Sequence, residues 1–196
     1  MIELQNVTMK DVPLILEWEN NPSLQELTLT PFKHITEQDV VSQFVRNGGG
    51  NFCSFSIKDM TNGALCGYTY LKDIDTENKS AFIGKVMIGN NDYRDGLTVF
   101  EAVRHLICYA FDVMKLNRIE GACMKEHYFT PFMLTAFGFK QEGLKRECVF
   151  KGQSYHDVLW YAMLQSYYIR ITKSGEMEIG KVVRRCTKLI KNSRKR

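Results

Sequence analysis

Apolar and polar residues alternate along this chain with two periods, and the order of the periods predicts a mixed α/β domain. A period of two, typical of strands, is clear in IELQNV at residues 2–7. Strands are expected at residues 2–7, 51–59, 64–73, 80–88 and 118–124 and in a final pair at 138–152 and 154–164. Helices are expected after starts at Thr8 and Thr36, at 98–115 and at 129–136.

The clearest helical pattern lies at residues 98–115, where apolar positions recur every three or four residues. The pair Asn62-Gly63 favours a hairpin between two expected strands, because both residues tolerate positive φ. Glycines 48–50 are expected to end the second helical region. The resulting order, β-α-α-β-β-β-α-β-α-β-β, contains no internal repeat and predicts one domain over residues 1–168.

The last part of the chain, residues 169–196, differs from the rest in charge. It carries 10 basic and two acidic residues, whereas residues 1–168 carry 16 basic and 20 acidic ones, so the net charges are +8 and −4. Apolar residues from Ile179 to Ile190 fall on one helical face, with lysines and arginines elsewhere around it. This pattern predicts a basic amphipathic helix. Such a helix packs against the domain or a partner subunit, stays partly disordered, or binds an anionic membrane, RNA or a ribosome.

Composition excludes several other classes of protein. The six cysteines have no CxxC spacing, so buried reduced thiols are expected and no metal site is expected. The N-terminus does not resemble a signal peptide, and no apolar run approaches the roughly 20 residues that span a bilayer. These features predict a cytoplasmic protein.

A candidate site for a phosphorylated ligand lies in the segment GNNDYRDGLTVFEA, residues 89–102. It connects an expected strand to an expected helix, and the first N–H groups of a helix have no partners within the helix. Such a helix start binds phosphate.

Several longer segments carry a resemblance to a known family. They are FIGKVMIGNNDYR at 82–94, EAVRHLICYAFDVMKLNRIEGAC at 101–123, AFGFKQEG at 136–143 and YHDVLWYAML at 155–164. With these segments the chain resembles the GNAT superfamily of N-acetyltransferases, in the branch of the ribosomal-protein and polyamine acetyltransferases. The resemblance covers residues 1–166 and implies a mostly antiparallel central sheet with a splayed cofactor cleft.

The resemblance implies that acetyl-CoA lies where strands 81–88 and 118–124 splay apart. Backbone groups near Val86, Met87 and Ile88 would pair with its pantetheine arm, and one backbone N–H would stabilise the oxyanion.

The phosphate loop departs from the family pattern R-G-x-G-x-G/A, because Asp95, Leu97 and Val99 fill the glycine places. Three interpretations remain open: the loop still binds the pyrophosphate, it prefers another acyl carrier, or it has lost the cofactor. In the first, the cofactor contacts are Arg94 and the backbone of Gly96, Leu97, Thr98, Val99 and Phe100.

The resemblance also supplies candidate catalytic residues. Thr130 stands where relatives carry a serine that protonates the leaving thiolate, although Pro131 after it also fits Thr130 as a helix N-cap. His127 replaces an asparagine that contacts the cofactor; it would accept the proton of the amine or contact the cofactor, or else is an ordinary surface residue. No glutamate base is found, because Tyr68, Tyr70 and Phe82 fill the expected places.

His34, Tyr155 and Asp157 are weaker candidates for substrate binding, and Glu19 for a base. A surface histidine at His34 and a positioning role for the segment 155–157 are the ordinary alternatives.

These observations predict an acetyl-CoA-dependent N-acetyltransferase that acts on a primary amine in a ternary complex. The acceptor would be an amino sugar, a polyamine or a protein N-terminus, with an anionic membrane or other anionic partner at residues 179–196 and a homodimer as further possibilities. The competing hypothesis is a catalytically silent module with a degenerate CoA loop, which recruits a partner through its basic tail.

Overall fold

The computed structural model describes residues 1–26, 28–46 and 50–194. A single sheet has the strand order β1-β2-β3-β4-β5-β7-β6. The strands are β1 (Ile2–Asn6), β2 (Cys53–Asp59), β3 (Leu65–Asp75), β4 (Ser80–Ile88), β5 (Arg118–Met124), β6 (Lys140–Lys151) and β7 (Ser154–Leu164). The predicted mixed α/β fold and the predicted strands are confirmed.

The helices follow the predicted order and include three short ones that were not expected. They are α1 (Val12–Glu19), α2 (Pro22–Glu26), α3 (Glu37–Val40) with its π-helical continuation η1 (Val41–Val45), the short η3 (Asn91–Tyr93), α4 (Thr98–Cys108) with its continuation η4 (Tyr109–Val113), α5 (Thr130–Phe137), α6 (Gln165–Lys173) and α7 (Ile179–Ser193). The unexpected helices are α2, η3 and α6. Residues 47–49, which include two of the glycines expected to end a helix, and residues 195–196 of the tail lie outside the described residues.

The sheet is antiparallel except between β4 and β5, which run parallel and pair only from Ser80 to Phe82 with Arg118 to Glu120. Beyond Phe82 the two strands separate, as the resemblance implied. A register shift against β3 places four residues of β4, from Ile83 to Val86, opposite three residues of β3, from Thr69 to Leu71. This bulge bends β4 and re-aims the side chains that follow it.

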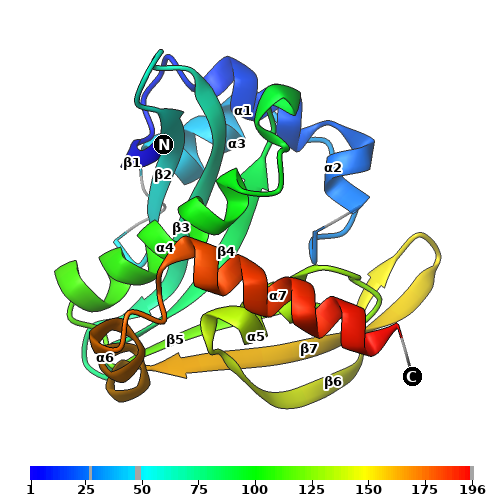
Figure 1. Ribbon diagram of the computed structural model, residues 1–196. Helices are drawn as coiled ribbons and strands as arrows, with labels where there is room; N and C mark the ends of the chain where they lie inside the picture. The colour runs from blue at the N-terminus through cyan, green and yellow to red at the C-terminus, as the bar shows by residue number, and fades with distance from the viewer. Residues whose placement is uncertain (27, 47–49, 195–196) are drawn as a thin grey trace.

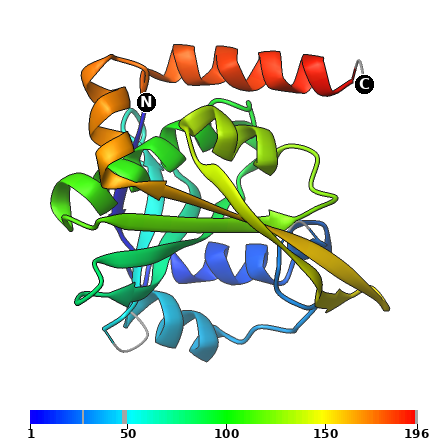
Figure 2. The same cartoon turned by 90° about the horizontal axis from the view of Figure 1, so that it is seen from below.

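Helices cover both faces of the sheet (Figures 1 and 2). In Figure 2, α4 and α5 lie on one face, and α7 lies outside them as a further layer; α1 and α3 lie on the opposite face. A large core cluster lies on the α4–α5 face and includes Phe100, Leu106 and Phe137. A smaller cluster under α1 includes Trp18 and Tyr68, whose rings stack.

The C-terminal helices belong to the same core as the domain. Tyr168 of α6 and Val182 and Cys186 of α7 are buried in the α4–α5 cluster. Arg185 of α7 donates from Nε to the carbonyl oxygen of Ala136 at 3.0 Å, near the end of α5. The apolar stripe of the tail is therefore packed on the domain, and Arg184, Lys188 and Lys191 are exposed.

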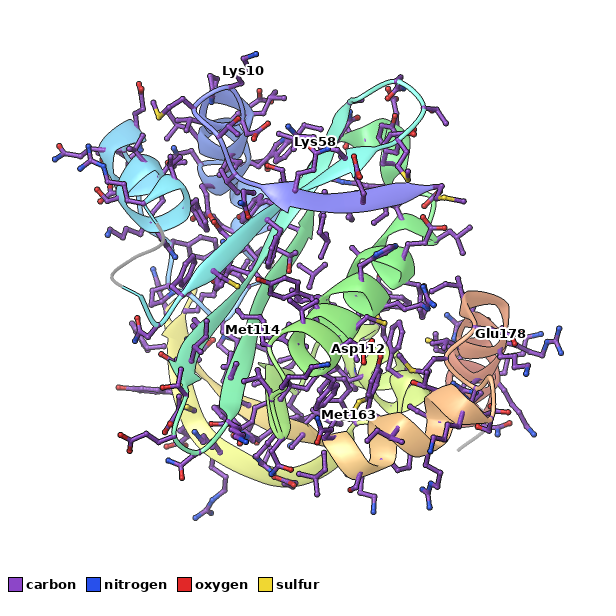
Figure 3. The ribbon with its side chains drawn as sticks, turned by 90° about the vertical axis from the view of Figure 1, so that its left-hand side faces the viewer. Lys10, Lys58, Asp112, Met114, Met163 and Glu178 are labelled. Carbon is purple, nitrogen blue, oxygen red and sulfur yellow. The ribbon has the colours of Figure 1, made fainter. Side chains whose placement is uncertain are left out.

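Figure 3 shows the two ends of the sheet. Lys10 and Lys58 lie at the end of the sheet near β1 and α1, whereas Asp112, Met114 and Met163 lie at the end near α4 and β7.

Candidate active site

A cleft of about 430 Å³ occupies the gap where β4 leaves β5. On the α4 side its walls include Val99, Val103 and Met133, and on the α1 side they include Tyr70 and Lys85. The cleft thus joins the two faces of the sheet. Predicted cofactor and catalytic residues that line it are Val86, Met87, Ile88, Arg94, Gly96, Val99, His127 and Thr130.

The start of α4 is capped by the side chain of Asp95. Oδ1 of Asp95 accepts hydrogen bonds from the N–H groups of Leu97 and Thr98, both at 2.8 Å. Partial burial of Asp95 opposes its ionisation, but the N–H groups of Thr98 and Leu97 outweigh this effect, and the pKa of Asp95 lies below its usual range. The carboxylate is therefore ionised at neutral pH and occupies part of the anion site at the start of α4.

The rest of that anion site stays open. Val99 and Phe100 precede the first helical bond, which the N–H of Glu101 donates to Leu97, so their N–H groups have no partner within the helix. Leu97 is exposed, whereas the side chains of Thr98 and Phe100 are buried and do not line the cleft. Any contact of a cofactor with these three residues would be through the backbone.

Arg94 lies at the edge of the cleft, where β4 ends. Its Nε donates to the carbonyl oxygen of Ile88 at 3.0 Å and its NH2 group donates to that of Gly89 at 3.3 Å. These bonds orient the guanidinium and leave further N–H donors for a phosphate. Arg94 is the described cation nearest in sequence to the capped start of α4.

The start of α5 is capped by a histidine, not by Thr130. Nδ1 of His127 accepts from the N–H groups of Phe129 and Thr130 at 3.3 and 3.2 Å. A backbone N–H only donates, so Nδ1 is unprotonated and Nε2 carries the proton. Desolvation lowers the pKa of His127, which keeps the ring neutral. Since its acceptor nitrogen is occupied, His127 is poorly placed to accept the proton of an amine.

Thr130, the first residue of α5, lines the cleft. Nε2 of His127 lies 3.3 Å from Oγ1 of Thr130, and with the tautomer above the ring donates to that oxygen. The hydroxyl proton of Thr130 is therefore directed away from His127 and is available to another acceptor. The alternative interpretation of Thr130 as the N-cap is wrong, because Thr130 already belongs to the helix.

A buried ion pair lies on the α1 side of the cleft. Nζ of Lys85, which follows the bulge in β4, donates to both carboxylate oxygens of Glu19 at 2.9 and 2.8 Å. The hydroxyl of Tyr68 donates to Oε1 of the same carboxylate at 2.5 Å. Glu19 and Lys85 expose 10% and 11% of their side chains. Three donors thus bind Glu19, which makes it unsuitable as a free base.

A second cavity, of about 420 Å³, meets the cleft at His127 and Tyr128. It is lined by Glu26 at the end of α2, by Phe32, and by the β6–β7 hairpin with Lys151 and His156. Lys151 is buried and donates to the carbonyl oxygens of Gln25 and Thr28 at 2.5 and 2.7 Å. It thereby ties the hairpin to the segment after α2 and closes one wall of this cavity.

The three predicted substrate residues lie outside both cavities. His34 is exposed in the segment before α3, and Tyr155 is exposed beside Phe150 on the hairpin. Asp157 accepts from Nζ of Lys125 at 3.2 Å and from the N–H of Glu147 at 3.0 Å. These contacts give Asp157 a positioning role in the hairpin. His156, between them, lines the second cavity.

The described residues of the site do not support a cysteine nucleophile or a bound metal ion. Burial raises the pKa of the Cys123 thiol, on the cleft wall, to about 12. It is therefore protonated and a poor nucleophile. Within residues 1–26, 28–46 and 50–194, no group of three or more His, Cys, Asp or Glu side chains is arranged to bind a metal ion. In that same part of the chain, no helix has the length and apolarity to cross a membrane.

Comparison with known proteins identifies the family. The model of the acetyltransferase (GNAT) domain matches residues 4–160. The chain belongs to the GNAT acetyltransferase family. It is an N-acetyltransferase by this membership, and acetyl-CoA is the cosubstrate of the family. The predicted family, enzyme class and cosubstrate are confirmed.

GNAT relatives match over most of the chain. An uncharacterized N-acetyltransferase of Bacillus licheniformis is 27% identical over 173 residues, which are 85% of this chain and 94% of the relative. An uncharacterized N-acetyltransferase of Bacillus subtilis is 25% identical over 166 residues, which are 83% of this chain and 92% of the relative. Spermidine N-acetyltransferase from Vibrio cholerae, solved with CoA and spermine, superposes with a TM-score of 0.79 at 19% identity, over 86% of this chain and 98% of that one. This last likeness concerns the fold.

The residues of the cleft fit acetyl-CoA with one exception. The separated edges of β4 and β5 suit a pantetheine arm, and Arg94 with the open N–H groups of Val99 and Phe100 suits phosphate. The exception is Asp95, whose carboxylate would repel a pyrophosphate at the start of α4.

Proposed function

We propose that this protein transfers an acetyl group to a primary amine by direct attack in a ternary complex. The observation that carries the proposal is the cleft that joins the two faces of the sheet and is lined by Thr130. A thioester bound on the α4 side and an amine entering from the α1 side meet in this gap. The high pKa of the Cys123 thiol argues against a covalent enzyme intermediate.

Acetyl-CoA supplies the activated acetyl group when it is bound. The separated edge of β4, near Val86 to Ile88, provides backbone N–H groups for the developing oxyanion. Thr130 donates its hydroxyl proton to the leaving thiolate and recovers a proton from water, and the Nε2–H of His127 stabilises the negative charge that develops on Oγ1 meanwhile. His127 acts through Thr130 and is a positioning residue.

No carboxylate or imidazole of the described cleft is placed to take the proton of the amine. Glu19 is bound by Lys85 and Tyr68, and Nδ1 of His127 is bound by two N–H groups. We therefore expect that the amine binds in its neutral form or loses its proton to water. The rate should then rise with pH until the amine is deprotonated.

The acceptor comes from the range already predicted: an amino sugar, a polyamine or a protein N-terminus. Cytoplasmic location, a homodimer and an anionic partner at residues 179–196 also remain predictions. An amphipathic insertion of the tail into a membrane would need its apolar stripe, which is packed on α4 and α5.

Calorimetric titration with acetyl-CoA tests the proposal, with desulfo-CoA and free phosphate as controls. We expect a dissociation constant of about 1–100 μM, equivalent to roughly −5.5 to −8 kcal/mol. Thiol release should then appear only when a primary amine is added. No binding up to millimolar acetyl-CoA would contradict the proposal and favour a catalytically silent module.

A further inference from the structure

The charges on the cleft wall are of one sign. Its charged lining residues are Lys72, Lys85 and Arg94, and none of its described lining residues carries a carboxylate. Arg94 lies toward the start of α4, where the phosphates of acetyl-CoA would bind. Lys72 and Lys85 lie on the α1 side, where the acceptor would enter.

Lys85 has one donor to spare. Two of its three N–H groups bind the oxygens of Glu19, which balances the charge of Lys85 and does not itself line the cleft. The remaining N–H offers an anion on the cleft side a charge-assisted hydrogen bond. A second ammonium group brought here would meet a like charge in a partly desolvated place.

Lys72 extends this cationic surface along the sheet. Its Nζ lies 4.9 Å from the centre of the Phe82 ring, which also lines the cleft. The rings of Phe82 and Trp160 are 5.1 Å apart, and Nζ of Lys145 lies 3.6 Å from the centre of the Trp160 ring. Two aromatic rings, each with a lysine over it, therefore continue the wall from the cleft onto the open sheet face.

Three carboxylates beside the Phe82–Trp160 pair have cationic partners. Asp73 lies 3.5 Å from Lys72 and exposes 69% of its side chain, so solvent screens it. Glu120, next to Phe82 across the β4–β5 pair, binds Arg118 at 2.6 Å. Glu142 binds the same arginine. Neither Glu120 nor Glu142 lines the cleft.

We propose that the acceptor amine carries an anionic group, a phosphate or a carboxylate, that binds Lys85 and Lys72 beside the Phe82–Trp160 pair. This inference rests on the proposed acetyl transfer and selects within its range of acceptors. A phosphorylated amino sugar or an amino acid fits the surface, whereas a polyamine brings two or more positive charges to a wall without carboxylates. Lys85 is thus a residue that determines specificity.

Matched acceptor pairs test this inference: glucosamine against glucosamine 6-phosphate, and butylamine against 4-aminobutyrate, with spermidine as the polycation. We expect kcat/KM to be about tenfold higher for at least one amine that carries the anionic group than for the matched amine that lacks it. The difference should lie mainly in KM, and its size is that of one charge-assisted hydrogen bond. The phosphate and carboxylate pairs distinguish the two sources of charge. A higher kcat/KM for spermidine than for every anionic amine, or no preference within either pair, would overturn the inference.

Lys85→Met should abolish the preference for the anionic member. Lys58→Met is the matched control, because Lys58 forms the other partly buried lysine–carboxylate pair of the sheet, 3.0 Å from Asp11 and near the β1 end (Figure 3). It should retain the preference. The double variant Glu19→Gln/Lys85→Met removes both charges together, so it avoids a buried unpaired carboxylate and should also lose the preference while remaining folded. An unchanged preference in both Lys85 variants, or an equal loss in Lys58→Met, would overturn the inference.

Calorimetric binding of glucosamine 6-phosphate and 4-aminobutyrate separates this inference from the proposed function. Binding of either that Lys85→Met weakens about tenfold would support the anion site even if no amine were acetylated. Binding that is absent, or equal in both proteins, would overturn it even if acetyl transfer were observed.

Discussion

The starts of α4 and α5 both lie at the cleft, and each is capped by a side chain from the loop before it, but the two caps differ in charge. Asp95 caps α4 with a carboxylate, and His127 caps α5 with a neutral imidazole. Both satisfy N–H groups that a helix leaves unpaired. The α4 cap places a negative charge where a cofactor phosphate would bind. The α5 cap is a neutral ring whose Nε2–H donates a hydrogen bond to Oγ1 of Thr130.

Because of this difference, helix stability and ligand binding are related in opposite ways at the two helix starts. At α4 the cap that stabilises the helix competes with the ligand, so stronger capping should weaken binding. At α5 the cap His127 also contacts the hydroxyl of Thr130, the proposed acid, so weaker capping should impair both helix stability and activity. The following predictions test each half of that comparison.

The largest effect is expected at the start of α5. Thr130→Val removes the hydroxyl proton for the leaving thiolate and keeps the size of the side chain, so kcat should fall about 100-fold with a smaller change in KM. Thr130→Ser should keep most of the activity. Steady-state kinetics with acetyl-CoA and an accepted amine measure both values. Thr135→Val, at an exposed position of the same helix, is the control; an equal loss there would contradict the role of Thr130.

A smaller effect, of opposite sign, is expected at the start of α4. Asp95→Asn removes the charge and keeps an oxygen that can accept the Leu97 and Thr98 N–H groups. Acetyl-CoA should therefore bind about three- to tenfold more tightly, as measured by calorimetry. Asp92→Asn removes a nearby exposed charge that does not cap α4, and should change the affinity less. Equal or weaker binding by Asp95→Asn would show that the carboxylate does not compete with the cofactor.

The stability of the α5 cap provides the third comparison. His127→Ala leaves the N–H groups of Phe129 and Thr130 without their acceptor, so the free energy of unfolding should fall by about 1 kcal/mol. His127→Asn supplies another acceptor and should recover part of the loss. Urea denaturation at pH 7.5 measures both. His34→Ala, at an exposed position without a cap, should have little effect, and a loss as large as that of His127→Ala would contradict the capping role.

The smallest effect is the pH dependence of the same cap. The pKa of His127 is lower in the folded protein than the ordinary histidine value of 6.5, because desolvation disfavours the charged ring. The unfolded chain then binds more protons as pH falls through this range, so folding stability should be full above about pH 6.5 and should decrease toward the folded pKa. Denaturation at pH 7.5, 6.5 and 5.5 should show a larger decrease for the wild type than for His127→Asn. Parallel decreases would exclude His127 as the source.

Much of the fold could be predicted because the periodic segments are long. In the strands between Cys53 and Ile88 and in α4, the spacing of the apolar residues predicts which side chains are buried. These elements form as predicted. Helix α6 was missed because Tyr168 and Ile171 are its only described buried residues, too few to define a stripe within nine residues. The gap between β4 and β5 was located through the family resemblance, since it leaves no mark in side-chain spacing.

The site was less predictable, for reasons that differ between residues. Asp95 before Gly96, Leu97 and Thr98 carries a capping signal that could have been recognised from the sequence. The pair of Lys85 and Glu19 could not, because the bulge in β4 changes which face its later side chains occupy and the partners are 66 residues apart. His34 was placed near the acceptor by its loop, and Tyr155 and Asp157 by the family resemblance of their strand, but the side chains that line the second cavity are Phe32 and His156.

The position of α7 after the whole sheet in the sequence affects how a newly made copy matures. Val182 and Cys186 complete the core over α4 and α5, yet a ribosome adds them only after every strand of the sheet. The whole sheet and both helices at the cleft are therefore synthesised before their outer cover exists. A copy that ends before Val182 keeps an exposed apolar surface on α5, which chaperones and proteases recognise. Quality control can in this way distinguish finished from unfinished copies by a helix that lies outside the catalytic cleft.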